Sequence, residues 1–118
     1  MPEDKFTRAL KKANEIEITV IGRNTGGQIT LPVWFVHEED TLWLLPVKGS
    51  KTQWYQNLAK NPTIIIKVGK EERSLNAQVL KTATSVGNVI KSFQQKYKPE
   101  MVAKYYPGPL DAAVKLKL

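Results

Sequence analysis

The sequence contains no cysteine and only one histidine, and both scarcities exclude kinds of chemistry. Without cysteine there can be no disulfide framework, no thiolate metal site and no thiol nucleophile. His37 cannot build a metal centre by itself, and we interpret it as a surface residue because it stands beside a charged turn. A serine–histidine–aspartate triad would have to use this same histidine, because the sequence contains no other. We therefore expect neither a metal site nor a hydrolase of this type.

Long apolar runs are absent as well. No segment approaches the ~20 apolar residues that cross a bilayer as a helix. The first residues lack the apolar middle part of a secretory signal, so we expect a cytoplasmic protein. The 118 residues, 42% hydrophobic and 25% charged, are ordinary usage for a single globular domain that spans residues 1–118.

The charge balance is strongly positive. Lysine and arginine total 18 against 11 acidic residues, which gives a net charge of +7. Such an excess favours anionic partners, among them phosphate cofactors, nucleic acid and acidic lipids. The lysines are spread along the chain without a dense cationic block, and this weakens the case for nucleic acid more than the case for a phosphate cofactor.

Periodicity predicts a mainly β, α+β fold. Alternating or β-branched segments predict strands over 15–21, 28–37, 41–47, 63–69, 73–83 and 111–118. Apolar residues at helical spacing predict helices over 3–13, 50–60, 85–98 and 99–106. Short turns join most of the strands, which favours a six-stranded antiparallel barrel with flanking helices. Pro32 cannot donate to a ladder, so it predicts an edge, a bulge or a position beside a ligand.

The segment GRNTGG, residues 22–27, forms a turn between the first two strands. On composition alone, a hairpin loop is the favoured interpretation. The alternative is a cradle for an anion, since Arg23, Thr25 and amides exposed by glycine gather within a few residues.

A second candidate anion site lies where the third strand meets the next helix. Ser50 and Gln53 have the S-x-x-Q spacing of a capping box, so Ser50 is predicted to cap this helix. Amides of the first turn, the helix dipole, Lys48 and Lys51 would then converge on one place, which suits a phosphate. The alternative is plain capping by Ser50 with lysines that are only solvated. The spacing is not that of a P-loop.

Large aromatic side chains are concentrated in the middle of the chain and near its end. They are Trp34, Phe35, Trp43, Trp54, Tyr55, Tyr105 and Tyr106. We expect most of them in the core of a small barrel. Trp34 and Phe35 are consecutive, so on a strand they would point to opposite faces. The outward one would need a helix, a partner subunit or a ring system to cover it.

The order of these motifs resembles the deazaflavin-dependent nitroreductase family. The segments GRNTGGQITLPVWFV and LWLLPVKGSKTQWYQNLAKNPTIIIKVG carry the resemblance, with a G-R-x-T-G loop, a K-G turn and then W-Y-x-N-L-x-x-N-P before a β-branched strand. It covers about residues 15–80, and the tail is similar more loosely. The family belongs to the flavin-binding split barrels related to pyridoxamine phosphate oxidase. The resemblance therefore implies a split β-barrel.

The resemblance also implies a cofactor, FMN or a 5-deazaflavin coenzyme, that lies in a groove of the barrel. The residues implied to bind it are Arg23, Thr25, Thr30, Leu31, Pro32, Lys48, Gly49, Ser50, Lys51, Trp54, Tyr55 and Asn57. Those implied to border the substrate are Trp34, Tyr105 and Tyr106. The chain departs from the family at Asn24 and Ile29, where relatives often carry cations. Because fewer cations lie near the loop, a cofactor with a single terminal phosphate, such as FMN, stays an open alternative.

The function implied is hydride transfer to a small organic electron acceptor. The cofactor carries the hydride and the protein supplies position and electrostatics. This agrees with a sequence that offers no candidate acid–base pair and leaves the catalytic residues unassigned. A cofactor carrier without turnover stays open, and a barrel that binds single-stranded nucleic acid is the alternative from another class. Related split barrels often hold the cofactor where two subunits meet, so we also expect a homodimer.

Overall fold

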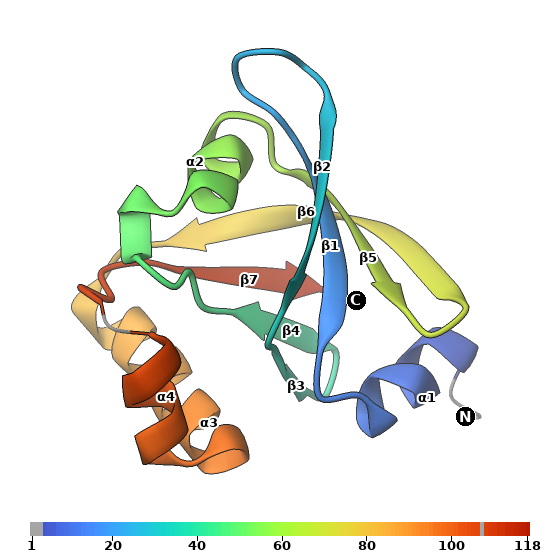
Figure 1. Cartoon of the computed structure of the whole chain (residues 1–118). Helices are drawn as coiled ribbons and strands as arrows, with labels where there is room; N and C mark the ends of the chain where they lie inside the picture. Colours follow the sequence, from blue (N-terminus) through green and yellow to red (C-terminus); the bar gives the residue numbers. More distant parts are fainter. Residues whose placement is uncertain (1–3, 107) are drawn as a thin grey trace.

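The computed structural model describes residues 4–106 and 108–118, and within them seven strands form one sheet with four α-helices around it (Figure 1). The strands are β1 (Ile16–Ile21), β2 (Gln28–Val33), β3 (Val36–Glu38), β4 (Thr41–Leu44), β5 (Thr63–Val68), β6 (Glu71–Leu80) and β7 (Ala113–Lys117). The α-helices are α1 (Lys5–Lys12), α2 (Gln53–Lys60), α3 (Ala83–Tyr97) and α4 (Pro99–Tyr105). One 3-10 turn, η1 (Gly49–Lys51), precedes α2.

The sheet has the strand order β2-β1-β5-β6-β7-β4-β3, and every neighbouring pair is antiparallel. β6 belongs to both halves of the sheet, because residues 71–76 pair with β5 and residues 77–80 pair with β7. The sheet curls into a half-barrel with β2 and β3 at its two edges (Figure 1). Pro32 lies on β2, so the prediction of an edge strand for it is confirmed.

The prediction of six strands is wrong by one, because the segment predicted as one strand over 28–37 is two strands. β2 pairs with β1, whereas β3 pairs with β4 at the opposite edge. The chain leaves the first edge at Trp34 and Phe35. Phe35 and Val36 are consecutive and both buried, but they belong to two separate clusters of core side chains. The segment is divided because its two parts pair with different strands at opposite edges of the sheet, which local β propensity does not encode.

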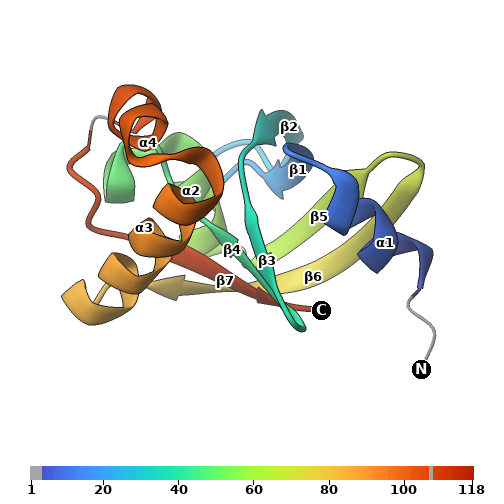
Figure 2. The ribbon, with the colours of Figure 1, turned by 90° about the horizontal axis from the view of Figure 1, so that it is seen from below.

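The two clusters lie on different sides of the sheet. The first fills the curl of the sheet, where Ile16, Ile18 and Val20 of β1 are all buried and so confirm the alternating strand face. Helices α1 and α2 contribute to this cluster. The second lies under α3 and α4, which stand on the other side of β3 from α1 in Figure 2. The helices of the second cluster therefore cover a different part of the sheet from α1.

The helix ends differ in part from the predicted ones. Ser50 does not cap α2, which begins after Thr52, so the predicted capping box is wrong. The Ser50 hydroxyl donates instead to Asp111, a partner far along the chain that sequence spacing could not reveal. At the other end α2 stops before Asn61 as predicted, and Asn61 is extended, with a φ of −132°. α3 begins at residue 83 because the Thr82 side chain caps it, which ends β6 at residue 80.

Candidate functional site

A pocket of about 440 Å³ opens beside the edge strand β2, between the chain after β4 and the helices α2 and α4. Its lining is mostly apolar and aromatic: Glu15, Leu31, Pro32, Val33, Trp34, Leu45, Val47, Trp54, Tyr105 and Tyr106. We call it the aromatic pocket. Its volume falls within the roughly 300–1,000 Å³ of small-molecule sites. Residues predicted both for the cofactor and for the substrate meet here: Leu31, Pro32, Trp34, Trp54, Tyr105 and Tyr106.

Trp34 is covered by helices of its own chain. Its ring stacks on Tyr97 of α3, with the ring centroids 4.2 Å apart and the planes 9° from parallel. Tyr105 meets the same ring edge-on at 5.4 Å. Phe35 points the other way and is fully buried in the first core cluster. The outward aromatic side chain therefore finds its cover in α3 and α4, and no partner subunit is needed for it.

The predicted phosphate turn borders this pocket. Val47 and Trp54 both line the pocket, and the turn is the segment between them. No side chain caps α2, because the hydroxyl of the N-cap residue Thr52 accepts a hydrogen bond from Lys48 N at 2.8 Å instead. The first turn of α2 also contains no acidic residue. The first-turn amides and the positive end of the helix dipole therefore lie beside the pocket, and the exposed Lys48 and Lys51 add two cations.

Gly49 and Ser50 give this turn its shape. Gly49 has a φ of +57°, and a Cβ atom there would collide with the Asp111 carboxylate and the Pro109 carbonyl oxygen, so only glycine fits. The Asp111 carboxylate accepts hydrogen bonds from the amide and the hydroxyl of Ser50, each at 2.7 Å. These bonds lower the pKa of Asp111. Both donors of Ser50 are thus used to hold the turn against the segment before β7.

The GRNTGG loop is tied to α2 by Arg23. The guanidinium of Arg23 donates to Asn57 Oδ1 at 2.7 Å and to Gln53 Oε1 at 2.8 Å. The Arg23 amide also donates to Asn57 Oδ1, at 3.1 Å, and Lys60 Nζ donates to the Arg23 carbonyl oxygen at 3.2 Å. Asn57 is buried, so this tie has a fixed anchor. The loop and the phosphate turn, far apart in sequence, are therefore both attached to one short helix.

Three other predicted site residues lie outside the aromatic pocket. The Thr25 hydroxyl accepts from Gly27 N within the loop at 3.2 Å. The Thr30 hydroxyl lies 2.7 Å from that of Thr19 at an exposed position of the sheet. Tyr55 is buried in the core, and its hydroxyl has no hydrogen-bond partner among the described residues. Burial, and then the charge of Asp111, raise the pKa of Tyr55.

Sequence reasoning missed several residues that line or build the site. They are Glu15, Val33, Leu45, Val47, Gln53 and Asp111. Val47 could have been found, because it directly precedes the K-G turn at the end of an apolar strand. Asp111 carried no local signal, since its partner Ser50 is 61 positions away. Tyr106, which the sequence predicted to border the substrate, lines the aromatic pocket, and its burial strongly raises the pKa of its hydroxyl.

Comparison with known families matches residues 3–104 of this chain to the family described as F420H(2)-dependent quinone reductase. The match spans most of the sequence. The chain belongs to the F420H2-dependent quinone reductase family. It is therefore an oxidoreductase that transfers a hydride between a deazaflavin and a quinone-type acceptor. Of the two cofactors that the sequence left open, membership in this quinone reductase family implies the deazaflavin.

Solved structures place this quinone reductase among the split barrels of the pyridoxamine phosphate oxidase type. An F420-H2 dependent reductase, FDR-A, aligns with a TM-score of 0.68 and 19% identity over 88% of this chain and 94% of its own. A haem storage protein, HutZ from Vibrio cholerae, aligns with a TM-score of 0.74 and 12% identity, over 96% and 87%. A putative pyridoxamine 5'-phosphate oxidase from Listeria innocua aligns with a TM-score of 0.69 and 12% identity, over 96% and 90%. No curated protein matches the sequence.

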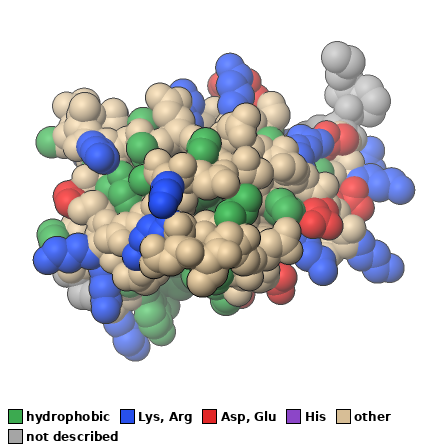
Figure 3. Space-filling model, turned by 90° about the horizontal axis from the view of Figure 1, so that it is seen from above, with side chains coloured by type: hydrophobic (Ala, Val, Ile, Leu, Met, Phe, Trp, Pro, Cys, Tyr) green, Lys and Arg blue, Asp and Glu red, His purple; other side chains and the backbone are tan. Residues whose placement is uncertain are grey.

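The surface of the quinone reductase carries its positive charge in a scattered way. Figure 3 looks onto the molecule from above, and Lys and Arg side chains are distributed over this face, with acidic side chains among them. No single cationic patch for a nucleic acid is visible there. Across the described ranges, no helix is both long and apolar enough to cross a membrane.

Proposed function

We propose that the aromatic pocket holds the ring system of the deazaflavin and that the turn from Lys48 to Lys51 holds its phosphate. The main observation in support of this proposal is that Val47 and Trp54, which flank this turn in the sequence, both line the pocket. A single ligand with a planar, largely apolar ring and a nearby phosphate would fill both places. The residue types fit such a group, because the pocket is aromatic and the helix start is cationic and without a side-chain cap.

The edge strand would form one wall of the ring site. Leu31, Pro32 and Val33 supply its apolar surface, and Pro32 has no N–H group that would need a partner there. Trp54 and Trp34 supply aromatic faces from the other elements. These side chains would orient the ring and exclude water from the reacting face. The reduced deazaflavin, when bound, supplies the hydride.

The acceptor would approach from the side of α4. Tyr105 is 47% exposed and Tyr106 is buried, and both line the pocket together with Trp34. Aromatic faces at this place suit the flat ring of a quinone. Two-electron reduction of a quinone needs a hydride and a proton. The exposed mouth at Tyr105 would give the acceptor oxygen access to solvent, which supplies that proton.

The phosphate contacts would come from Lys48 first, with Lys51 and the first-turn amides of α2 beside it. Arg23 would contribute from the loop. Only two of the five N–H groups of its guanidinium donate to Gln53 and Asn57, so the other three would be available to the phosphate. Ser50 would act by shaping the turn, because its donors are engaged by Asp111. The exposed Asn24 and Ile29 leave the outer part of the loop without the cations of many relatives.

Replacing Lys48 tests the placement of the phosphate. Lys48→Ala removes a charge-assisted contact, so binding of the deazaflavin should weaken about ten- to a hundredfold, or roughly 1.5–3 kcal/mol. The stability of the cofactor-free protein should hardly change, since exposed lysines contribute little to folding. Titration of purified protein with the deazaflavin, followed by absorption or fluorescence, measures the effect.

Lys70→Ala is the matched control. Lys70 is exposed in the turn between β5 and β6, away from α2 (Figure 1). Lys60 on α2 is unsuitable because its ammonium group holds the Arg23 carbonyl oxygen. Equal affinities of the wild type and Lys48→Ala would show that the phosphate lies elsewhere.

A further inference from the structure

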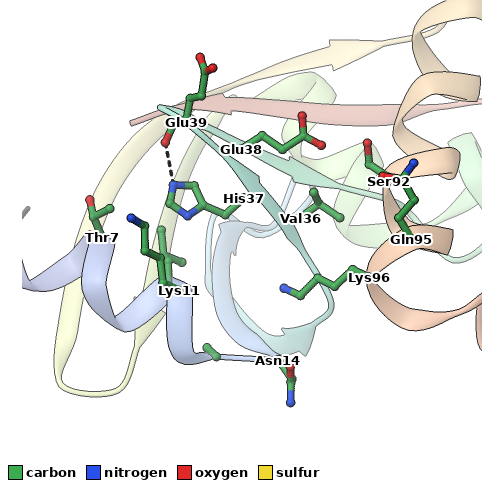
Figure 4. A pocket seen from close by; sticks show the side chains of 12 residues that line it. Thr7, Lys11, Asn14, Val36, His37, Glu38, Glu39, Ser92, Gln95 and Lys96 are labelled. Carbon is green, nitrogen blue, oxygen red and sulfur yellow. Dashed lines mark hydrogen bonds between the residues drawn. The ribbon is translucent and has the colours of Figure 1, made fainter.

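A second cavity formed by the described residues is separate from the aromatic pocket. It has a volume of about 760 Å³ and lies between α1, β3 and α3 (Figure 4). The two cavities lie on either side of a short segment, since Trp34 lines the aromatic pocket and Val36 lines this cavity. Between the two cavities, the main-chain N–H and carbonyl groups of Phe35 are both hydrogen-bonded to the hydroxyl of Tyr97. We call it the α1–α3 cavity.

Three cationic or cation-forming side chains come to this cavity from three different elements. Lys11 belongs to α1, His37 to β3 and Lys96 to α3. Figure 4 shows the side chains of Lys11 and Lys96 on either side of the His37 ring. The His37 Nε2 lies 2.8 Å from the main-chain oxygen of Glu39. A carbonyl oxygen only accepts, so Nε2 donates this bond and the ring is held in place, and Nδ1 can donate to an anion when the ring is protonated.

Lys96 is held in place without an acidic partner. Its Nζ donates to the Phe35 carbonyl oxygen at 2.9 Å and lies 3.6 Å from the centre of the Phe35 ring. No carboxylate of the described residues makes an ion pair with it. Partial burial lowers the pKa of Lys96 to about 8. A nearby anion would relieve this cost, because it favours the charged ammonium.

The acidic side chains of the cavity do not lie against the His37 ring. In Figure 4 the Glu39 carboxylate points away from the His37 ring, and the Glu38 carboxylate lies toward Ser92. Leu10, Ala13 and Val36 add an apolar surface. The cavity therefore offers a cationic side and an apolar surface together.

We propose that the α1–α3 cavity is a second ligand site, which binds a small organic anion. Its carboxylate or phosphate group lies between Lys96 and His37, and its apolar body covers Leu10, Ala13 and Val36. The site does not depend on where the deazaflavin binds, because the two cavities share no lining residue.

Three small aromatic probes test this site by their charge. Benzoate carries a carboxylate, phenyl phosphate a phosphate, and benzyl alcohol has a similar size without charge. Each is titrated into the full chain and followed by amide shifts in ¹H–¹⁵N spectra. We expect saturable shifts around residues 36–38 and 92–96 with at least one anion, and about tenfold weaker binding of benzyl alcohol. The anion that binds more tightly identifies the group.

Two variants and a control assign the effect to named side chains. Lys96→Gln and His37→Gln should each weaken the bound anion by about tenfold. Lys91→Gln, an exposed position on the same helix that does not line the cavity, should leave it unchanged. His37→Gln decides the matter if Lys96→Gln does not fold. The proposal is overturned if benzyl alcohol binds as tightly as the anions, if no probe saturates, if only residues 48–54 shift, or if both variants bind like the wild type.

Discussion

Individual side chains at the start of α2 differ in what they still have to offer a ligand. Lys48 and Lys51 are exposed, and neither forms an ion pair with a carboxylate of the described residues, although the charge of Lys51 contributes to lowering the pKa of Asp111. Ser50, two positions after Lys48, has both of its donors bonded to Asp111. Neighbours in the sequence therefore divide into candidate ligand contacts and turn-shaping groups, and the difference lies in partners that come from elsewhere in the chain.

Tyr55 offers a test at a single atom. Its hydroxyl is buried without a partner among the described residues, so the free-energy cost of desolvating it is not offset by a hydrogen bond. Tyr55→Phe should therefore leave the free energy of unfolding unchanged or raise it by up to about 1 kcal/mol. Urea unfolding followed by tryptophan fluorescence measures it.

Tyr97→Phe is the comparison for that experiment. The single proton of the Tyr97 hydroxyl is shared between the carbonyl oxygens of Asn14 and Phe35, at 2.8 and 2.9 Å, and the hydroxyl oxygen accepts from Phe35 N. Its removal should cost about 1–3 kcal/mol. A loss of stability in Tyr55→Phe as large as that in Tyr97→Phe would mean that the Tyr55 hydroxyl has a partner such as buried water.

Lys96 predicts a dependence of stability on pH. Burial lowers its pKa to about 8 in the folded protein, whereas the ordinary value is 10.5. Between these values the unfolded chain binds more protons than the folded one, so the free energy of unfolding rises with pH. The rise should begin near pH 8 and should be smaller in Lys96→Met. Denaturant unfolding at pH 7, 8 and 9.5 measures this difference, and parallel curves for the two proteins would contradict it.

At the scale of elements, α2 organises the candidate site. This helix is only two turns long. Its residues Gln53 and Asn57 accept hydrogen bonds from Arg23 of the GRNTGG loop, and its first turn lies beside the aromatic pocket. Trp54 and Leu58 lie one turn apart and are buried, so packing fixes the helix while its start stays accessible. Cofactor contacts on two distant segments would thus be held in register by one helix.

Asn57 is the residue that tests this tie. Asn57→Ala would leave the Arg23 amide and one guanidinium N–H group without their acceptor, which should cost about 1–3 kcal/mol of stability. Looser positioning of Arg23 should also weaken deazaflavin binding. Gln53→Ala is the control, because Gln53 is exposed and accepts a single bond, and its loss should cost less than about 1 kcal/mol. Equal effects of the two substitutions on stability would show that burial of Asn57 is unimportant to the tie.

At the scale of the whole molecule, the curled sheet produces two separate cavities. α2 and α4 border the aromatic pocket, and α1 and α3 border the α1–α3 cavity. Figure 2 shows α1 and the α3–α4 pair on opposite sides of β3. Each cavity is therefore assembled from elements that are distant in sequence. A half-barrel leaves such spaces because its sheet does not close on itself.

A homodimer is the prediction that belongs to this scale. The half-barrel leaves β2 as an edge strand whose first three residues are exposed, with Ile29 at 44% exposure. Exposed edges of this kind favour association with another chain. We expect twice the mass of one chain by light scattering at micromolar concentration with the deazaflavin bound. A monomer under these conditions would contradict the prediction.

The sequence by itself determined the local elements. Alternation in 16–21 fixed a strand and its buried face, and β-branching in 63–68 fixed another. Helical spacing of apolar residues placed the end of α2 at residue 60, and the K-G turn before this helix marked the phosphate candidate. These signals are carried by residues within a few positions of each other, so propensity and period suffice to find them. The order of the motifs also led to the family that the comparison confirms.

The tertiary structure alone decided the rest. It broke the strand at Trp34 and Phe35, because residues 28–33 pair with β1 whereas residues 36–38 pair with β4, and it bonded Ser50 to Asp111 across 61 positions. It also bonded Arg23 to Asn57 across 34 positions and placed Lys96 beside His37 in a cavity. Contacts of this range form only when the sheet has curled and brought the segments together. Neither propensity nor spacing along the chain encodes which distant groups will then meet.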